Sequence, residues 1–226
     1  MSVEEVNKYV IIVAGGSGSR MKSDIPKQFL LLNELPVLMH TIKAFHQADF
    51  TLSIIVVLPE QQLSYWQKLS LKYDFTIPHQ IVIGGRTRFH SVWNGLQSIK
   101  STSGVVAIHD GVRPLVSSKV ILKTFELAVS KGSAVVAVPM KESVRTVEEN
   151  GANSHLDRSK LWTIQTPQTF KLAVLKEAYS QGYQDFFTDD ASVFEAFGEV
   201  VNLVEGDYGN IKITTPEDLI FAKAML

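Results

Sequence analysis

A glycine-rich loop near the amino terminus is followed by two cationic side chains, a combination that could bind a triphosphate. The loop begins at the end of the apolar run Val10–Ala14 and contains Gly15, Gly16 and Gly18. Glycine backbones let N–H groups approach phosphates closely, and doubly wound sheets bind ligands at the carboxyl ends of their strands. Arg20 and Lys27 could neutralise charge that develops at an α-phosphorus. Taken alone, the loop could also be a plain tight turn.

Two better-known phosphate motifs do not fit this loop. A dinucleotide-binding loop needs glycine or alanine at the position where Met21 stands, and the chain contains no GxxxxGK[ST] pattern. The sequence therefore argues against a dehydrogenase and against a P-loop enzyme.

A carboxylate follows a second apolar run and could bind a divalent cation. Asp110 ends the run that begins at Val105, and Mg²⁺ takes few protein ligands while leaving room for phosphates. Asp110 is therefore the candidate metal ligand, although Asp-Gly is also a common turn. Arg113 fits nucleotide binding and pairing with a carboxylate equally well. We interpret His109, which follows the apolar run, as a packed core histidine.

The elements that must position these residues alternate along the chain between strands and helices. Apolar runs with many β-branched residues predict strands at Val10–Ala14, Leu52–Leu58, Gln80–Ile83, Val105–His109, Ala134–Val138 and Val200–Val204. Runs that are apolar throughout are typical of a parallel sheet covered on both faces. Together with the helices between them, they predict an α/β fold with a doubly wound, mostly parallel sheet.

Three helix boundaries are also predicted. The stripe of apolar residues in Ser118–Lys131 indicates a helix that Gly132 ends. Thr188 is predicted to cap a helix whose first turn carries Asp189 and Asp190, and Thr215-Pro216 to begin the last helix.

One polar segment, residues 143–160, interrupts this alternation. It contains a turn-like Glu149-Asn150-Gly151 between two possible short strands, which predicts a β-hairpin arm. Such an arm buries little of itself, so we expect a partner subunit. With no linker or repeat in the sequence, we interpret residues 1–226 as one domain that includes the arm.

The composition excludes several classes of protein. The chain has 226 residues, a net charge of −1 and no cysteine. A global basic field for nucleic acid is therefore absent, as are disulfides, thiolate metal sites and cysteine nucleophiles. The acidic start and the short apolar run that follows are neither an export signal nor a membrane span, so we expect a cytoplasmic protein.

Six segments along the chain carry a resemblance to a known family. They are AGGSGSRMKSDIPKQFL, GGRTRFHSVWNGL, HDGVRP, TPQTF, TDDAS and GNIKITTPEDL. In this order they resemble the 2-C-methyl-D-erythritol 4-phosphate cytidylyltransferases of the non-mevalonate isoprenoid pathway, which have a Rossmann-like nucleotidyltransferase fold. The chain departs from the family pattern at Ser143, where threonine is common, and in HDGVRP, where HDAARP is more usual. Neither change removes a charged group.

The resemblance implies a reaction and a site. CMP would pass from CTP to 2-C-methyl-D-erythritol 4-phosphate by direct in-line displacement, with Mg²⁺ on Asp110 and with Arg20, Lys27 and Lys212 as catalytic cations. The CTP contacts would be Ala14, Gly15, Gly16, Gly18, Gly85, Arg86, Ser91, Asp110 and Arg113. The contacts to the polyol phosphate would be Ser143, Arg158, Thr166, Thr188 and Lys212. Some arm residues would act across a homodimer interface. Arg88 is expected to order its loop.

Two alternatives stay open on the sequence. A ribitol-5-phosphate cytidylyltransferase shares the fold, the opening loop and features like TPQTF. A CTP-binding regulatory module would bind the nucleotide without releasing pyrophosphate, but retention of Arg20, Lys27, Asp110 and Lys212 argues against it.

Overall fold

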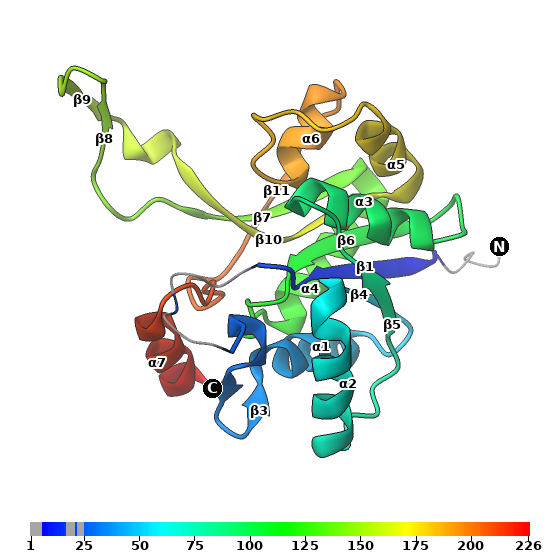
Figure 1. The fold of residues 1–226 in the computed structure, drawn as a ribbon. Coiled ribbons are helices and arrows are strands. Elements are labelled where there is room, and N and C mark those ends of the chain that lie inside the picture. The colour runs from blue at the N-terminus through cyan, green and yellow to red at the C-terminus, as the bar shows by residue number, and fades with distance from the viewer. Residues whose placement is uncertain (1–5, 17–20, 22–24) are drawn as a thin grey trace.

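The computed structural model describes residues 6–16, 21 and 25–226, and it is built on a seven-stranded sheet (Figure 1). The strand order is β11-β7-β10-β6-β1-β4-β5. The strands are β1 (Lys8–Val13), β4 (Ser53–Leu58), β5 (Gln80–Ile83), β6 (Val105–Asp110), β7 (Ser133–Pro139), β10 (Trp162–Lys171) and β11 (Leu203–Glu205). Neighbouring strands are parallel except at β10, which is antiparallel to both β6 and β7. The predicted fold class is confirmed.

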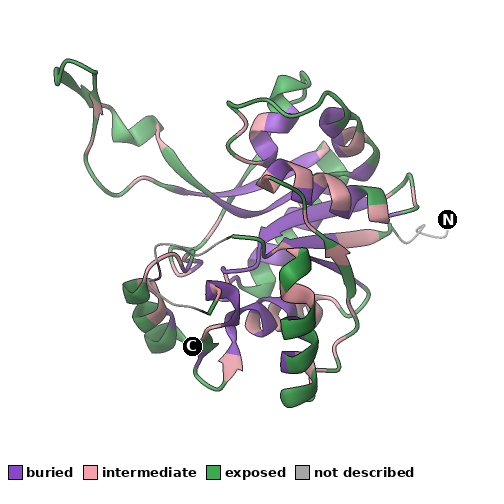
Figure 2. Ribbon diagram, in the orientation of Figure 1, coloured by how far each residue is buried: buried purple, intermediate pink, exposed green. Residues whose placement is uncertain are grey.

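Helices cover both faces of this sheet (Figure 1). On one face lie α1 (Val37–Ala48), α2 (Leu63–Lys72) and α4 (Ser118–Lys131); on the other lie α3 (Arg88–Ser98), α5 (Leu172–Ser180) and α6 (Asp190–Ala196). Alternate residues of β1 point to opposite faces: Val10 and Ile12 join the first apolar cluster, and Ile11 joins the second. Two-sided burial explains why the strands are apolar throughout, and Figure 2 shows the buried sheet.

Short elements complete the body of the fold. A small antiparallel pair, β2 (Leu31–Leu32) and β3 (Leu35–Pro36), precedes α1, and 3-10 turns occupy η2 (Lys27–Phe29) and η3 (Glu60–Gln62). The carboxyl-terminal helix α7 (Pro216–Met225) packs Ala222 into a third apolar cluster with Leu32 and Ile213. No helix among the described residues combines the length and the apolar character that a membrane span requires.

The helix boundaries agree with the sequence at two of three places. Helix α4 spans the predicted residues, and Gly132 ends it in a left-handed conformation with φ 92°. Thr215 begins α7 through a capping box. The prediction that Thr188 caps α6 is wrong, because Asp189 takes that position and accepts a hydrogen bond from the Ser192 N–H.

The segment 143–160 forms a β-hairpin arm, as predicted. Strands β8 (Val144–Val147) and β9 (Asn153–Leu156) pair antiparallel, and η4 (Arg158–Lys160) follows them. The arm extends away from the rest of the chain (Figure 1), and most of its residues are exposed (Figure 2). Beyond its own two strands the hairpin therefore buries little surface.

Gly95 lets α3 lie close to the sheet. A Cβ atom at this position would lie 2.8 Å from Cγ2 of the buried Ile11, nearer than such atoms approach one another. The close packing at Gly95 sets the distance between α3 and the strands β1 and β4. It therefore also sets the position of the loop that leads into α3.

We expect Gly95→Ala to destabilise the protein. Overpacking costs about 1–3 kcal/mol, which outweighs a gain in helix propensity of up to about 1 kcal/mol. The free energy of unfolding in urea should therefore fall by about 1–2 kcal/mol. Gln97→Ala, on the exposed side of the same helix, is the control and should change it by less than about 0.5 kcal/mol. A Gly95→Ala variant as stable as the parent would contradict this account of the packing.

Candidate active site

The glycine-rich loop begins at the end of β1 and is anchored there by backbone and side-chain bonds. The Ala14 N–H donates to the Val57 carbonyl at 3.0 Å, and Gln28 Nε2 donates to the Ala14 carbonyl at 2.8 Å. Lys27 precedes Gln28 in η2 and is 9% exposed; a Cβ atom built on Gly16 would lie 3.7 Å from its Cε. Gly18 and Arg20, also predicted here, lie outside the described residues.

A second loop, which leads into α3, faces the first. Thr87 caps the helix, and the Ser91 hydroxyl donates to the Thr87 carbonyl while it accepts from the Gly85 N–H. A Cβ atom on Gly85 would clash with the Cβ and backbone of His90, so only glycine fits this turn. Ser91 thus fixes the shape of the turn, in which Gly85 and Arg86 are exposed.

Both loops line a pocket of about 230 Å³, which we call the first pocket. The predicted residues that it brings together are Ala14, Gly15, Gly16, Lys27, Gly85, Arg86, Ser91, Asp110 and Lys212. Five further residues line this pocket that were not predicted from the sequence: Val13, Gln28, Thr87, Arg88 and Val112. The lining combines glycines, whose backbone N–H groups a ligand can approach closely, with cationic side chains. Both features favour binding of a phosphorylated ligand.

Asp110, at the end of β6, is surrounded by three cations. Lys212 Nζ lies 2.9 Å and Arg113 Nε 3.3 Å from its Oδ2, and Arg88 Nε lies 3.7 Å from its Oδ1. Burial alone would raise the pKa of Asp110, but the charges of Arg88, Lys212 and Arg113 outweigh this effect and hold it well below its usual range. The carboxylate is therefore ionised at every physiological pH.

Arg88 connects this carboxylate to a second, fully buried one. One terminal nitrogen of Arg88 lies 2.6 Å from Oδ2 of Asp190 in α6, and the Tyr179 hydroxyl donates to Oδ1 at 2.5 Å. Burial would lower the pKa of Arg88, but Asp190 and Asp110 raise it above its usual range. Arg88, the first residue of α3, therefore joins two carboxylates from different elements.

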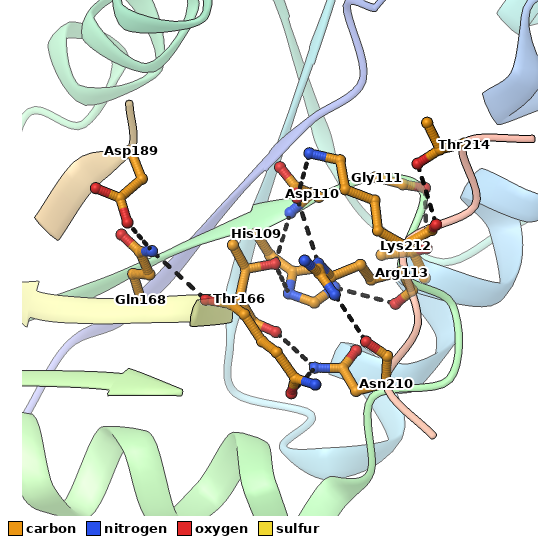
Figure 3. Close-up of polar contacts among 12 residues, drawn as sticks. His109, Asp110, Gly111, Arg113, Thr166, Gln168, Asp189, Asn210, Lys212 and Thr214 are labelled. Atoms are coloured by element: carbon orange, nitrogen blue, oxygen red, sulfur yellow. Dashed lines mark hydrogen bonds and ion pairs between the residues drawn. The ribbon is translucent and has the colours of Figure 1, made fainter. Parts of the chain in front are cut away.

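Arg113 pairs with a carboxylate, one of the two roles left open by the sequence. It also donates through Nη1 to the Asn210 carbonyl at 2.7 Å, and Asn210 Nδ2 in turn donates to the Thr166 carbonyl at 2.8 Å. The Thr166 hydroxyl accepts from the Asp110 N–H at 3.1 Å. As Figure 3 shows, these bonds join β6, β10 and the segment before α7 into one polar network.

His109 belongs to this network and is fully buried, as expected of a core histidine. Its ring packs edge-on against Phe45, Nε2 lies 3.1 Å from the Arg113 carbonyl, and Nδ1 lies 3.1 Å from the Thr166 hydroxyl. Burial lowers the pKa of His109 to about 4, so the ring is neutral. Since a carbonyl only accepts, Nε2 carries the proton and Nδ1 accepts from Thr166.

A second pocket, of about 260 Å³, adjoins the first and shares part of its wall. Arg88, Asp110 and Lys212 line both pockets. The remaining residues of the second pocket are Arg113, Ile164, Gln165, Thr166, Gln168, Thr188 and Asp189. Of the predicted contacts to the polyol phosphate, Thr166, Thr188 and Lys212 are therefore found here. Because the shared wall lines both pockets, a ligand bound in one pocket would meet a ligand bound in the other at this wall.

Two predicted contacts, Ser143 and Arg158, line neither pocket. Both are exposed: Ser143 lies directly before β8, and Arg158 begins η4 after β9. Arg158 Nη1 donates to the Lys141 carbonyl at 2.5 Å. Because the arm extends away from the chain that carries it, these two side chains are not positioned to act in their own pockets (Figure 1).

The donors available to a divalent cation are few. Among the described residues, no three His, Cys, Asp or Glu side chains are grouped as a metal site, and Asp110 is the one acid that lines the first pocket. A single carboxylate fits Mg²⁺ when phosphate oxygens of a ligand supply further coordination. It does not fit a cation held by the protein alone.

We expect His109→Gln to reduce the acid sensitivity of folding. The pKa of His109 is lower in the folded state, so as pH falls from about 6.5 to about 4 the unfolded state takes up the proton first and stability is lost. The loss between pH 7 and pH 4.5 should be about 2–3 kcal/mol for this group. Glutamine can keep both hydrogen bonds but does not titrate.

The measurement is the free energy of unfolding in urea at both pH values for parent and variant. The variant should lose less stability than the parent on acidification. An equal loss in the two proteins would contradict the neutral, buried state of His109.

Comparison with known proteins places the chain in a family. Residues 8–226 match the family profile described as 2-C-methyl-D-erythritol 4-phosphate cytidylyltransferase. A protein of that name from Porphyromonas gingivalis is 52% identical over 223 residues, which cover 98% of this chain and 99% of the relative. A similar relative from Phocaeicola vulgatus is 49% identical and is covered to 100%.

Solved structures agree with the sequence comparison. The structure of the enzyme of this name from Francisella tularensis is 35% identical with a TM-score of 0.81 and covers 97% of this chain and 100% of that one. The 4-diphosphocytidyl-2C-methyl-D-erythritol synthase of Anaerococcus prevotii has a TM-score of 0.84 at 30% identity, covering 97% and 96% of the two chains. The chain therefore belongs to the 2-C-methyl-D-erythritol 4-phosphate cytidylyltransferase family.

Proposed function

We propose that the chain transfers CMP from CTP to 2-C-methyl-D-erythritol 4-phosphate, giving 4-diphosphocytidyl-2-C-methyl-D-erythritol and pyrophosphate. The observation that carries this proposal is the pair of adjacent pockets that share Arg88, Asp110 and Lys212. A nucleotidyl transfer needs two phosphorylated ligands whose reacting atoms meet, and a cationic wall common to both sites is where they would meet.

CTP occupies the first pocket. Its triphosphate lies along Gly15 and Gly16 with Lys27 beside it. Arg20, which lies outside the described residues, is proposed as a further cation for the triphosphate. The base lies against the turn at Gly85, Arg86 and Ser91, whose fixed backbone donors and acceptors select cytosine. The other nucleotide contacts proposed are Ala14, Gly18, Asp110 and Arg113. Of these, Arg113 lines the second pocket rather than the first, so it would contact the nucleotide only at the wall where the two pockets meet.

The polyol phosphate occupies the second pocket with its phosphate toward Lys212. Thr166 and Thr188 supply neutral donors there, and Arg113 adds a cation. In the reaction an oxygen of this phosphate attacks the α-phosphorus of CTP, and the bond to the oxygen that bridges to the β-phosphate breaks. Pyrophosphate carries that oxygen away, so no covalent enzyme intermediate forms.

The step needs charge compensation more than proton transfer. A phosphate monoester near neutral pH is already an anionic nucleophile, so no general base is required. His109 fits this view, since it is buried and both of its ring nitrogens are engaged within the protein. Lys27, Lys212 and Arg20 position the two anions and stabilise the charge that spreads over the transferred group.

Asp110 is the residue that would hold Mg²⁺, together with oxygens of the triphosphate. When bound, the cation supplies Lewis-acid neutralisation of phosphate charge. Lys212 and Arg113, which contact Asp110, would then turn toward the ligand phosphates. Both substrates are charged and cross membranes poorly, which favours the cytoplasm as the place of reaction.

The assay that tests this function is pyrophosphate release from CTP and Mg²⁺. Methylerythritol phosphate and ribitol 5-phosphate should be offered in parallel. We expect release with methylerythritol phosphate alone. Release only with ribitol 5-phosphate would keep the chemistry and change the substrate, and binding of CTP with no release in either case would indicate a regulatory module.

We further infer that the chain acts as one nucleotidyltransferase domain within a homodimer, whose arms act in trans. Ser143 and Arg158 line neither pocket of their own chain, so they reach a phosphorylated substrate only in a partner's second pocket. Arg158 would then clamp the substrate phosphate together with Lys212.

Mixing two inactive variants tests this arrangement. Lys27→Met damages the pocket and Arg158→Ala damages the arm, and each variant alone should retain little turnover. After the two are unfolded together and refolded, half of the dimers are mixed, and each mixed dimer has one intact site. Recovery of about a quarter of parent activity is therefore expected from a symmetric dimer. No recovery on mixing would contradict the action of the arm in trans.

A further inference from the structure

The second pocket contains one apolar side chain. Ile164, in the first half of β10, is 39% exposed, and every other described side chain that lines this pocket is polar or charged. Ile164 belongs to none of the three apolar clusters of the described residues. Its surface is thus available to a ligand rather than used in the core.

The strand β10 is irregular where it lines this pocket. Ile164 pairs with Ala137 of β7, but the next aligned pair is Gln168 with Val135, so the register shifts between them. Irregularities of this kind occur often beside active sites, where they redirect side chains. Gln165 and Thr166, which follow Ile164 within this shift, are 6% and 5% exposed and also line the pocket.

We propose that Ile164 contacts the methyl branch of the substrate and selects branched over unbranched polyol phosphates. The inference rests on the function proposed above. The phosphate of the substrate must lie at the wall shared by the two pockets, because it attacks the nucleotide there. The carbon chain then extends past Thr166, whose polar neighbours can bond its hydroxyls, and the methyl group at C2 requires an apolar surface. Ile164 is the surface that this pocket offers.

The size of the expected effect follows from what one methyl group can contribute. A hydrophobic contact to one extra carbon discriminates between substrates by about 10-fold to 200-fold. Because Ile164 is partly open to solvent, we expect the lower end, about a 10-fold preference in kcat/KM for methylerythritol phosphate over erythritol 4-phosphate.

The test compares these two substrates in the full chain with CTP and Mg²⁺. Ile164→Thr keeps the branched Cβ and replaces the ethyl group (Cγ1 and Cδ1) with a hydroxyl. Ile164→Val keeps an apolar surface. We expect Ile164→Thr to reduce the preference to within about 3-fold of equality and Ile164→Val to keep most of it. Ile81→Thr, at a similarly exposed position in β5, is the matched control and should keep the preference of the parent.

The outcomes separate the inference from the function on which it rests. If Ile164→Thr lowers kcat/KM equally for both substrates, or leaves the ratio at the parent value, the methyl contact is wrong although the enzyme is active. If the parent releases no pyrophosphate with methylerythritol phosphate, the proposed function fails and the inference fails with it. The thermal unfolding midpoint of each variant shows whether a loss arises from the fold.

Discussion

The carboxylate of Asp110, held among three cations, is the interaction on which the site depends. The residues that meet there come from the end of β6, from the start of α3 and from the segment before α7. Desolvating such an ion is costly, and removing one partner of a buried pair leaves an uncompensated charge. The parallel sheet brings the ends of its strands to one edge, so the same edge carries the glycine-rich loop and this ion cluster.

Cations outnumber acids at this junction, which prepares it for anionic ligands. Among the described acids, Arg88, Arg113 and Lys212 form ion pairs only with Asp110 and Asp190, and Asp189 also lines the second pocket. Lys27 adds a fourth cation in the first pocket. Asp190 holds Arg88 in place, and the Tyr179 hydroxyl holds Asp190 in turn, so the protein itself positions Arg88. Lys212 is more exposed, and it can move from Asp110 to a phosphate at lower cost.

Much of the fold was predictable from local patterns, whereas contacts distant in sequence were not. Two-sided burial makes β1, β4 and β6 apolar throughout, and Gly132 marks the end of α4, so these were found. Strand β10 was missed because it is rich in Thr and Gln and contains Pro167 at its register shift. The cap of α6 is one residue later than the sequence predicts. Asp190 is buried against Arg88 and is the first residue of the helix, so the residue before it, Asp189, is the cap in place of Thr188. The Arg88–Asp190 pair spans 102 positions, and no local pattern reveals it.

Whether the two pockets bind the two substrates side by side can be seen in a crystal structure with methylerythritol phosphate, Mg²⁺ and a CTP analogue that cannot be cleaved between its α- and β-phosphates. We expect the nucleotide in the first pocket, the polyol phosphate in the second, and the α-phosphorus at the wall formed by Arg88, Asp110 and Lys212. A polyol phosphate bound away from the second pocket, or an α-phosphorus turned away from this wall, would contradict this arrangement.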